Sequence, residues 1–334
     1  MSVPKQFKYI LVGLSVLALV SIVYKTNMLS NSADTFHAEE AYRVTYEYFF
    51  KTDTAATEVR AFLPKNNARQ EIVGQKSVMP ETVLFSTLSE GPNIRGRWST
   101  DLKNTYESIS YSFLFRGKGQ IFGLTELFKP IPKGMESYLE TTQNIQTNAE
   151  PIAELAKDLT KGTESDKAIL KALFEYVHNI PSAPIVTLTD ALGALERGQA
   201  SCNGKSRLLV ALARNLGYPS RIKGGIILKE SNKRTSHAWV EVYTNNSRAP
   251  FDALNGHFAY LPANYMELYE GDAFLVTHTP GIQFDYSYEI RKQESISWLN
   301  DETNHSEKIT AFSLWRVVIG NIIAKKILFL LLML

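Results

Sequence analysis

The spacing of apolar residues changes along the chain, and this change constrains the fold more than any other feature of the sequence. Between residues 39 and 127 apolar and polar residues alternate, as in AYRVTYEY at residues 41–48 and ESISYSFLF at residues 107–115. Alternation that uses aromatic and β-branched residues is typical of half-buried strands. The sequence therefore predicts a small β-sandwich-like domain over residues 39–127.

From about residue 150 the apolar residues follow the longer period of helices. The stretches at residues 151–159 and 169–177 each place apolar residues on one helical face, and residues 203–216 predict a third helix that stops at Gly217. After Gly217 the pattern returns to strands, in RIKGGIIL and then in HAWVEVY at residues 237–243. Helices followed by antiparallel strands predict an α+β domain.

Two apolar segments lie at the ends of the sequence. Residues 7–24 include an uncharged run that is slightly shorter than the roughly 20 residues of a membrane-spanning helix. We interpret this segment as an uncleaved transmembrane anchor, followed by a polar linker at residues 25–38. A cleaved signal peptide is the main alternative, because its apolar core is only about 7–15 residues long. Lys5 and Lys8 precede the run, which predicts a cytoplasmic N-terminus and a main domain outside the cytoplasm.

The C-terminal hydrophobic segment, residues 312–334, fits two interpretations equally well. Lys325 and Lys326 interrupt its apolar run. The segment can lie at a membrane interface, with its charges among the lipid headgroups. It can also be the start of a transmembrane helix in a longer protein, because the apolar residues after Lys326 are too few to span a bilayer.

The composition excludes several functional classes. The 334 residues contain one cysteine and six histidines, which excludes an intrachain disulfide scaffold and leaves little for a cysteine-rich zinc module. His257 and His278 have no partner at the spacing of metal ligands, so we predict no metal site and no cofactor. The formal net charge of +2 argues against a nucleic-acid-binding protein, which would need a concentrated basic surface.

The single cysteine, Cys202, directly precedes the third predicted helix. At a helix N-terminus, unpaired backbone N–H groups and the positive end of the helix dipole stabilise the thiolate, which is the nucleophilic form. On position alone, inert packing is the more common role of a cysteine beside an apolar helix.

Two further residues favour a catalytic role for Cys202. His237 begins a predicted strand whose opposite face is aliphatic, so we expect its imidazole to line a cleft. Asp252 follows near the start of the next predicted strand, where its carboxylate can accept the second imidazole N–H. Taken singly, a surface histidine and a turn aspartate are the ordinary interpretations. A nucleophile, a base and an orienting acid in this secondary-structure context predict a Cys–His–Asp triad.

The sequence around these three residues resembles the transglutaminase-like superfamily of bacterial cysteine enzymes. The resemblance lies in LARNLGYPSR at residues 212–221, followed by His-Ala-Trp from His237 and by Phe251-Asp252. It covers about residues 150–260, and we assign the transglutaminase-like domain to residues 150–290. The resemblance implies a papain-like fold in which Cys202 is the nucleophile, His237 the base and Asp252 the orienting acid.

Acyl-transfer chemistry also needs hydrogen-bond donors for the oxyanion. The backbone N–H of Cys202 is the natural first donor, because it lies at the nucleophile itself. Gln199 is a candidate for the second donor. A solvated loop residue is an equally good interpretation of Gln199.

The layout of the sequence is similar to a proteobacterial family in which a transglutaminase-like domain is fused to seven transmembrane helices. That similarity implies a bacterial inner-membrane protein with one N-terminal anchor and a periplasmic main domain. Members of the family are often described as inactive and are associated with ATP-grasp peptide ligases, whereas the three triad residues are all present here. We predict cysteine-dependent hydrolysis of a peptide or other amide, or acyl transfer through a thioester. The alternative is a catalytically inactive binding module coupled to membrane helices or to a ligase partner.

Overall fold

The computed structural model describes residues 34–52, 56–128, 130–131, 133–184, 189–244 and 247–293. The predicted anchor at residues 7–24 and the predicted C-terminal membrane segment at residues 312–334 lie outside these ranges. Within them, no helix is long and apolar enough to cross a membrane.

The first part of the described chain is made of strands, as the alternating pattern predicts. Residues 34–38, which we predicted as the end of the linker, already belong to the first strand. The alternation buries one face of this strand, so that Val44, Tyr46 and Tyr48 are fully enclosed. The strands before the helical region are β1 (Asp34–Lys51), β2 (Thr57–Phe62), β3 (Gln70–Val78), β4 (Leu84–Glu90), β5 (Asn93–Thr100) and β6 (Tyr106–Phe122).

Helices follow the first strands. After a 3₁₀ turn at Glu136–Tyr138, the described α-helices are α2 (Glu150–Thr160), α3 (Asp166–Asn179), α4 (Ala191–Arg197) and α5 (Cys202–Asn215). Ser165 caps α3, because its hydroxyl accepts a hydrogen bond from the N–H of Ala168 at 3.2 Å. Helix α4 was not predicted at all.

The second set of strands begins after α5. These strands are β7 (Ser220–Ile227), β8 (Ser231–Lys233), β9 (His237–Thr244), β10 (Ser247–Asp252), β11 (His257–Phe258), β12 (Tyr260–Leu261), β13 (Tyr265–Glu270), β14 (Val276–His278) and β15 (Gln283–Gln293). The described strands form three antiparallel sheets, in the orders β12-β6-β1-β15-β8, with β3 also on β6, then β11-β10-β9-β7-β13, and β14-β2-β5-β4.

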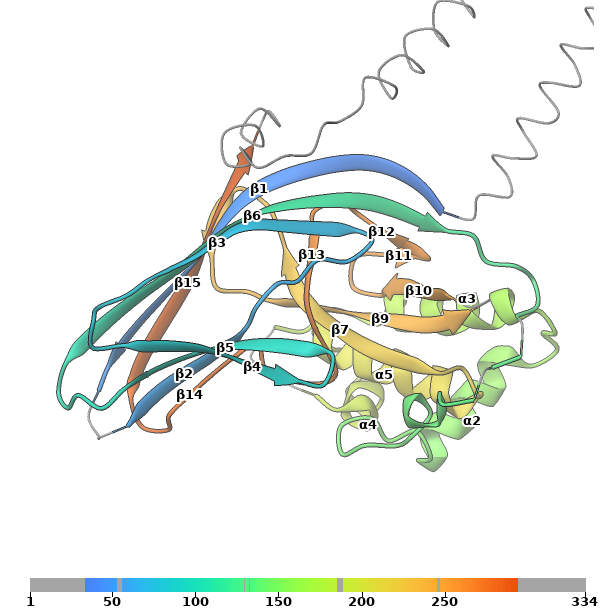
Figure 1. The fold of residues 1–334 in the computed structure, drawn as a ribbon. Coiled ribbons are helices and arrows are strands. Elements are labelled where there is room, and N and C mark those ends of the chain that lie inside the picture. Colours follow the sequence, from blue (N-terminus) through green and yellow to red (C-terminus); the bar gives the residue numbers. More distant parts are fainter. Residues whose placement is uncertain are drawn as a thin grey trace, which may run out of the picture. The chain divides into compact units, whose positions relative to one another are not determined.

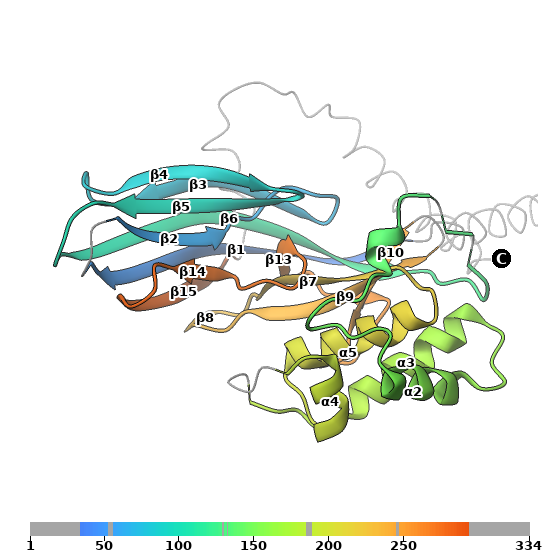
Figure 2. The ribbon, with the colours of Figure 1, turned by 90° about the horizontal axis from the view of Figure 1, so that it is seen from below.

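The helices all pack on one face of the β7–β9–β10 sheet (Figures 1 and 2). The aliphatic side of β9, at Ala238, Val240 and Val242, is buried against them, together with the apolar faces of α3 and α5. The face of β9 predicted to be aliphatic is therefore the one that packs against the helices. This arrangement fixes the N-terminus of α5 relative to the start of β9.

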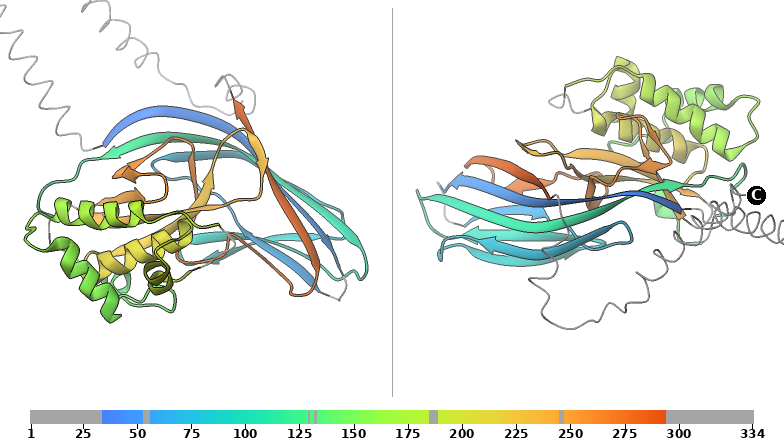
Figure 3. Two further views of the ribbon diagram at one scale, coloured as in Figure 1. Left: turned by 180° about the vertical axis from the view of Figure 1, so that it is seen from behind. Right: turned by 90° about the horizontal axis from the view of Figure 1, so that it is seen from above.

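The other two sheets lie against each other and share one hydrophobic core (Figure 3). Aromatic rings dominate this core: Tyr46 lies 5.5 Å from Phe113 and 5.1 Å from Tyr288, measured between ring centroids. β15 pairs with β1 along Ala41–Lys51, and β14 pairs with β2. The predicted ranges 39–127 and 150–290 therefore share sheets. The α+β class with antiparallel strands, predicted from the change of period, is confirmed.

Candidate active site

Cys202 is the first residue of α5, and only 6% of its surface is exposed. The loop before it is tied to the chain at the end of α3. The N–H of Ala200 donates to the carbonyl oxygen of Pro181 at 3.1 Å, and the N–H of Ala183 donates to the carbonyl oxygen of Ala200 at 3.0 Å. These two bonds hold the approach to the nucleophile in one conformation. The first N–H groups of α5 have no partner within the helix.

A glycine allows this close approach. A Cβ added to Gly204 would lie 2.2 Å from Oγ1 of Thr189 and 2.9 Å from the Cβ of Ala200. The first turn of α5 is therefore pressed against the segments that lead to it. The small side chains of Ala200 and Gly204 on either side of Cys202 allow this packing.

His237 is the first residue of β9 and lies opposite Gly225 of β7. Its imidazole is 7% exposed and is surrounded by aromatic rings. The indole of Trp239 lies 6.4 Å away in a stacked orientation, and the ring of Tyr265 meets it edge-on at 5.7 Å. Gly225 allows the close approach of β13, because a Cβ there would lie only 1.9 Å from the carbonyl oxygen of Met266 and 3.1 Å from the indole of Trp239.

Asp252 lies at the end of β10 and is almost completely buried, with 1% of its surface exposed. Its Oδ2 contacts Nε2 of His237 at 2.7 Å and accepts hydrogen bonds from the hydroxyl of Tyr265 at 2.7 Å and the side-chain amide of Asn255 at 2.8 Å. Its Oδ1 accepts the backbone N–H groups of Leu254 and Asn255 at 3.0 and 3.1 Å. Five donors thus satisfy this buried carboxylate and fix its orientation.

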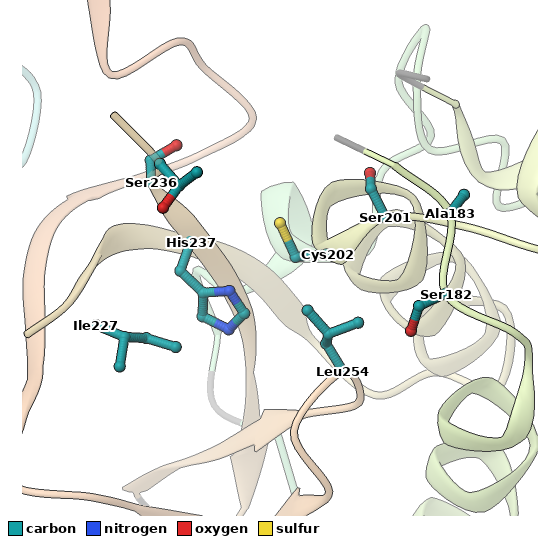
Figure 4. Close-up of a pocket in the computed structure, with 9 residues that line it drawn as sticks. Ser182, Ala183, Ser201, Cys202, Ile227, Ser236, His237 and Leu254 are labelled. Atoms are coloured by element: carbon teal, nitrogen blue, oxygen red, sulfur yellow. The ribbon is translucent and has the colours of Figure 1, made fainter. Parts of the chain in front are cut away.

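The imidazole of His237 joins the carboxylate to the thiol. Because Nε2 faces Asp252, Nδ1 is the nitrogen left to interact with the thiol of Cys202, and this interaction contributes to the raised pKa of His237. Figure 4 shows His237 on its strand, opposite Cys202 at the end of the helix. The structure brings together all three residues of the predicted triad.

The electrostatics of the site favour a protonated imidazole. Burial lowers the pKa of His237, but the hydrogen bonds and negative charges of Asp252 and Cys202 outweigh burial and raise it to about 9. Burial would raise the pKa of Asp252, yet the hydrogen bond and positive charge of His237, with the Tyr265 and Asn255 donors, hold it well below its usual range. An imidazolium between a carboxylate and a thiol stabilises a thiolate.

Cys202 and His237 line a cleft with a volume of about 240 Å³. Ser201 and Cys202 stand on its helix side and Ser236 and His237 on its strand side (Figure 4). The described residues that line the cleft are otherwise small, apolar or hydroxylic: Ser182, Ala183, Ile227, Thr235 and Leu254. None of them is an Asp, Glu, Lys or Arg. The cleft therefore suits an uncharged part of a substrate.

Comparison with known proteins agrees with this geometry. Residues 153–253 match the family model described as Transglutaminase-like superfamily. The chain contains a transglutaminase-like domain. Cys202, His237 and Asp252 all lie within the matched range. No curated protein sequence matches the chain.

Two solved structures are similar to the chain that holds this transglutaminase-like domain, and the first shares its fold. A candidate cysteine protease from Cytophaga hutchinsonii is 16% identical, with a TM-score of 0.65 over 78% of this chain and 93% of that chain. The periplasmic domain of TgpA from Pseudomonas aeruginosa is 13% identical, with a TM-score of 0.33 over 66% of this chain and 95% of that chain. At this identity the first likeness shows a common fold that extends well beyond the transglutaminase-like domain itself.

Gln199, the predicted second oxyanion donor, is not brought to the cleft. Its side chain is exposed in the loop after α4, and Gln199 is not among the described lining residues. The backbone N–H of Cys202 remains the available donor at the nucleophile. Within the described part of the chain, no group of three His, Cys, Asp or Glu residues is arranged to hold a metal ion.

The sequence did not reveal two residues that support the triad of the transglutaminase-like domain. Asn255 lies three residues after Asp252 in the turn DALNG, and Asp-to-backbone hydrogen bonds are a known signal of such turns. Tyr265 reaches Asp252 from β13, and nothing in the local sequence indicates this long-range contact.

Proposed function

We propose that this protein is a cysteine-dependent amidase or peptidase, or an acyltransferase, that works through a thioester on Cys202. One observation carries the proposal. The imidazole of His237 lies opposite the thiol of Cys202 in one cleft and is held from behind by the buried carboxylate of Asp252 at 2.7 Å (Figure 4). This is the arrangement of nucleophile, base and orienting acid that acyl-transfer enzymes share on several unrelated folds.

In the first step, the Cys202 thiolate attacks the carbonyl carbon of an amide. A carbon–sulfur bond forms, and the carbonyl oxygen becomes an oxyanion near the backbone N–H of Cys202. The carbon–nitrogen bond then breaks, and the imidazolium of His237 gives its proton to the leaving amine. Because the pKa of His237 is raised to about 9, the imidazole carries this proton at neutral pH.

In the second step, a new nucleophile resolves the thioester. His237, now neutral, takes a proton from water or from a second amine as that molecule attacks the thioester carbon. The carbon–sulfur bond breaks, and the thiolate and imidazolium are restored. Water gives hydrolysis and an amine gives transfer, and the same triad supports both outcomes. Asp252 keeps the imidazole oriented through both steps.

The substrate class that best fits this chemistry is a peptide or another amide. The cleft supports this choice, because apart from the Cys202–His237 pair none of its described lining residues is charged, so none competes with a neutral amide group for the space beside Cys202. We further propose that the domain acts outside the cytoplasm, anchored by residues 7–24. Lys5 and Lys8 before the apolar run support that orientation.

Acylation by p-nitrophenyl acetate tests the proposal without knowledge of the natural substrate. The thiolate attacks the ester carbonyl, p-nitrophenolate leaves, and the acetyl group stays on Sγ as a thioester. We expect a rapid burst of p-nitrophenolate and an acetyl group located at Cys202 by peptide mass analysis. Hydroxylamine should remove that acetyl group, because it cleaves thioesters.

Two variants serve as controls. Cys202→Ala should lose the burst, and His237→Ala should slow it by at least about 100-fold, in line with general acid–base contributions. The proposal fails if the burst persists in Cys202→Ala, or if Cys202 in the unmodified protein is not acylated faster than in His237→Ala. The second outcome would support the inactive binding module.

A further inference from the structure

A second pocket lies beside the active-site cleft. It is formed by β15 and by the segment around β14, which belong to the two sheets that share the aromatic core. It has a volume of about 190 Å³, and aromatic residues dominate its lining. Phe284, Tyr286 and Tyr288 come from one face of β15, where they alternate with the polar residues Asp285 and Ser287. Phe274, Leu275, Val276 and His278 come from the segment around β14.

The two pockets share one residue, Ser236. It lines the cleft beside Cys202 and also lines the aromatic pocket. Ser236 directly precedes His237, and Figure 4 shows it at the strand side of the cleft, next to the imidazole. A molecule lying across Ser236 therefore reaches both the thiol and the aromatic pocket.

Contacts within the pocket hold its rings in place. His278 stacks on Phe284 at 4.4 Å, and Phe284 stacks on Tyr286 at 5.8 Å, measured between ring centroids. The hydroxyl of Tyr286 donates to the carbonyl oxygen of Arg234 at 3.1 Å, which ties β15 to the chain that leads into His237. The pocket is thus a preformed part of the same surface as the active site.

The lining indicates what the pocket binds. None of its described lining residues is an Asp, Glu, Lys or Arg. Nδ1 of His278 interacts with the carbonyl oxygen of Thr279 at 2.9 Å, and the hydroxyl of Tyr286 is also engaged. Phe274 also lines the pocket and is 63% exposed, so its ring is accessible to a ligand.

We propose that this pocket is a specificity subsite that binds one aromatic or bulky aliphatic side chain of a peptide substrate. The peptide backbone lies across Ser236 and presents its scissile amide to Cys202. This inference rests on the proposed function, because it names the substrate of the same site. It also gives a role to β14 and β15, which lie outside the range matched by the transglutaminase-like family model.

Peptidyl vinyl sulfones test the subsite. The Cys202 thiolate adds to the vinyl carbon farther from the sulfone to form a carbon–sulfur bond, and the carbanion beside the sulfone takes a proton from His237, so that no group leaves. One set of probes carries alanine throughout or phenylalanine at one position at a time. We expect one phenylalanine probe to modify Cys202 at least about tenfold faster than the all-alanine probe, the scale on which apolar pockets discriminate.

Two variants should remove that preference. Phe284→Ala takes away the central ring of the pocket, and Phe274→Ala takes away the exposed ring at its edge, which is the substitution less disruptive to folding. In each variant the rate of Cys202 modification by the preferred phenylalanine probe should fall close to the rate with the all-alanine probe. Leu84→Ala is the matched control, because Leu84 is an apolar residue of β4 that is 71% exposed and does not line the pocket. It should keep the full preference.

Acylation by p-nitrophenyl acetate separates the two proposals. If that reaction is present but no phenylalanine probe is preferred, or if both variants keep the preference, the subsite is wrong and the proposed function stands. Competition by neutral oligosaccharides, but not by phenylalanine peptides, would also overturn the subsite. If Cys202 is not acylated in the unmodified protein, the proposed function itself fails.

Discussion

Tyr265 donates its hydroxyl hydrogen to Oδ2 of Asp252 over 2.7 Å. This is the same oxygen that contacts His237, so the phenol fixes the carboxylate in the orientation that holds the imidazole. The side-chain amide of Asn255 donates to the Tyr265 oxygen at 2.9 Å and completes the link. The proposed triad is therefore held in place from β13 as well as by its own strands.

Replacing Tyr265 by phenylalanine tests this support. The ring remains, but the carboxylate loses one donor, and we expect the free energy of unfolding to fall by about 1–2 kcal/mol. Alkylation of Cys202 at pH 6 should also slow, because Asp252 orients His237 less firmly. Tyr260→Phe is the matched control, since no hydrogen bond from its hydroxyl to the triad is described. Equal effects of the two substitutions on alkylation would contradict the role given to Tyr265.

The Asp252→Asn variant tests the carboxylate itself. An amide of the same shape cannot stabilise the imidazolium of His237, whose pKa should therefore drop from about 9 towards its ordinary range. We expect the burst with p-nitrophenyl acetate to slow at least about 100-fold while the protein stays folded. NMR titration of the His237 ring protons measures the pKa directly. An unchanged titration would show that Asp252 does not raise it.

The close packing at Gly204 gives a third prediction. A methyl group there would clash with Oγ1 of Thr189 at 2.2 Å, so Gly204→Ala should lower the free energy of unfolding by about 1–3 kcal/mol despite the better helix propensity of alanine. Urea denaturation measures this loss. Adding Thr189→Ala removes the nearest clashing atom and should restore part of the stability. If the double variant recovers no stability, the strain does not come from the contact with Thr189.

The stability of the protein should depend on pH above neutrality. The raised pKa of His237 means that its contribution is fully present below the unfolded-state pKa of about 6.5 and is lost as the pH rises through about 9. Over this interval we expect the free energy of unfolding to fall by up to about 3 kcal/mol. The His237→Gln variant should show a much flatter dependence. A steep fall in that variant would assign the pH dependence to other groups.

The local parts of the site could be predicted from the sequence. Helix α5 follows a clear apolar period, and the alternation in β9 identified both the buried aliphatic face and the position of His237. The order of Cys202, His237 and Asp252 within these elements was then enough to expect them together. Each of these inferences uses only short-range patterns.

The remaining features depend on contacts between distant parts of the chain. β15 pairs with β1 from more than two hundred residues away, as at Tyr288 and Tyr46, and no local pattern reports such a pairing. This is why the sequence suggested separate ranges where the structure has shared sheets. Helix α4 was not predicted because it is too short to show a clear apolar period. Its cap residues are nevertheless ordinary ones, Asp190 before the helix and Gly198 after it.

The pH dependence of Cys202 alkylation by iodoacetamide tests the central claim most directly. If His237 holds a thiolate–imidazolium pair, alkylation followed by intact mass should stay fast at pH 6, well below the range where free thiols ionise, near a pKa of about 8.5. In the His237→Ala variant, Cys202 should then react with iodoacetamide only at the higher pH typical of a free thiol. A profile in the unmodified protein like that of a free thiol, or one unchanged by His237→Ala, would contradict the account.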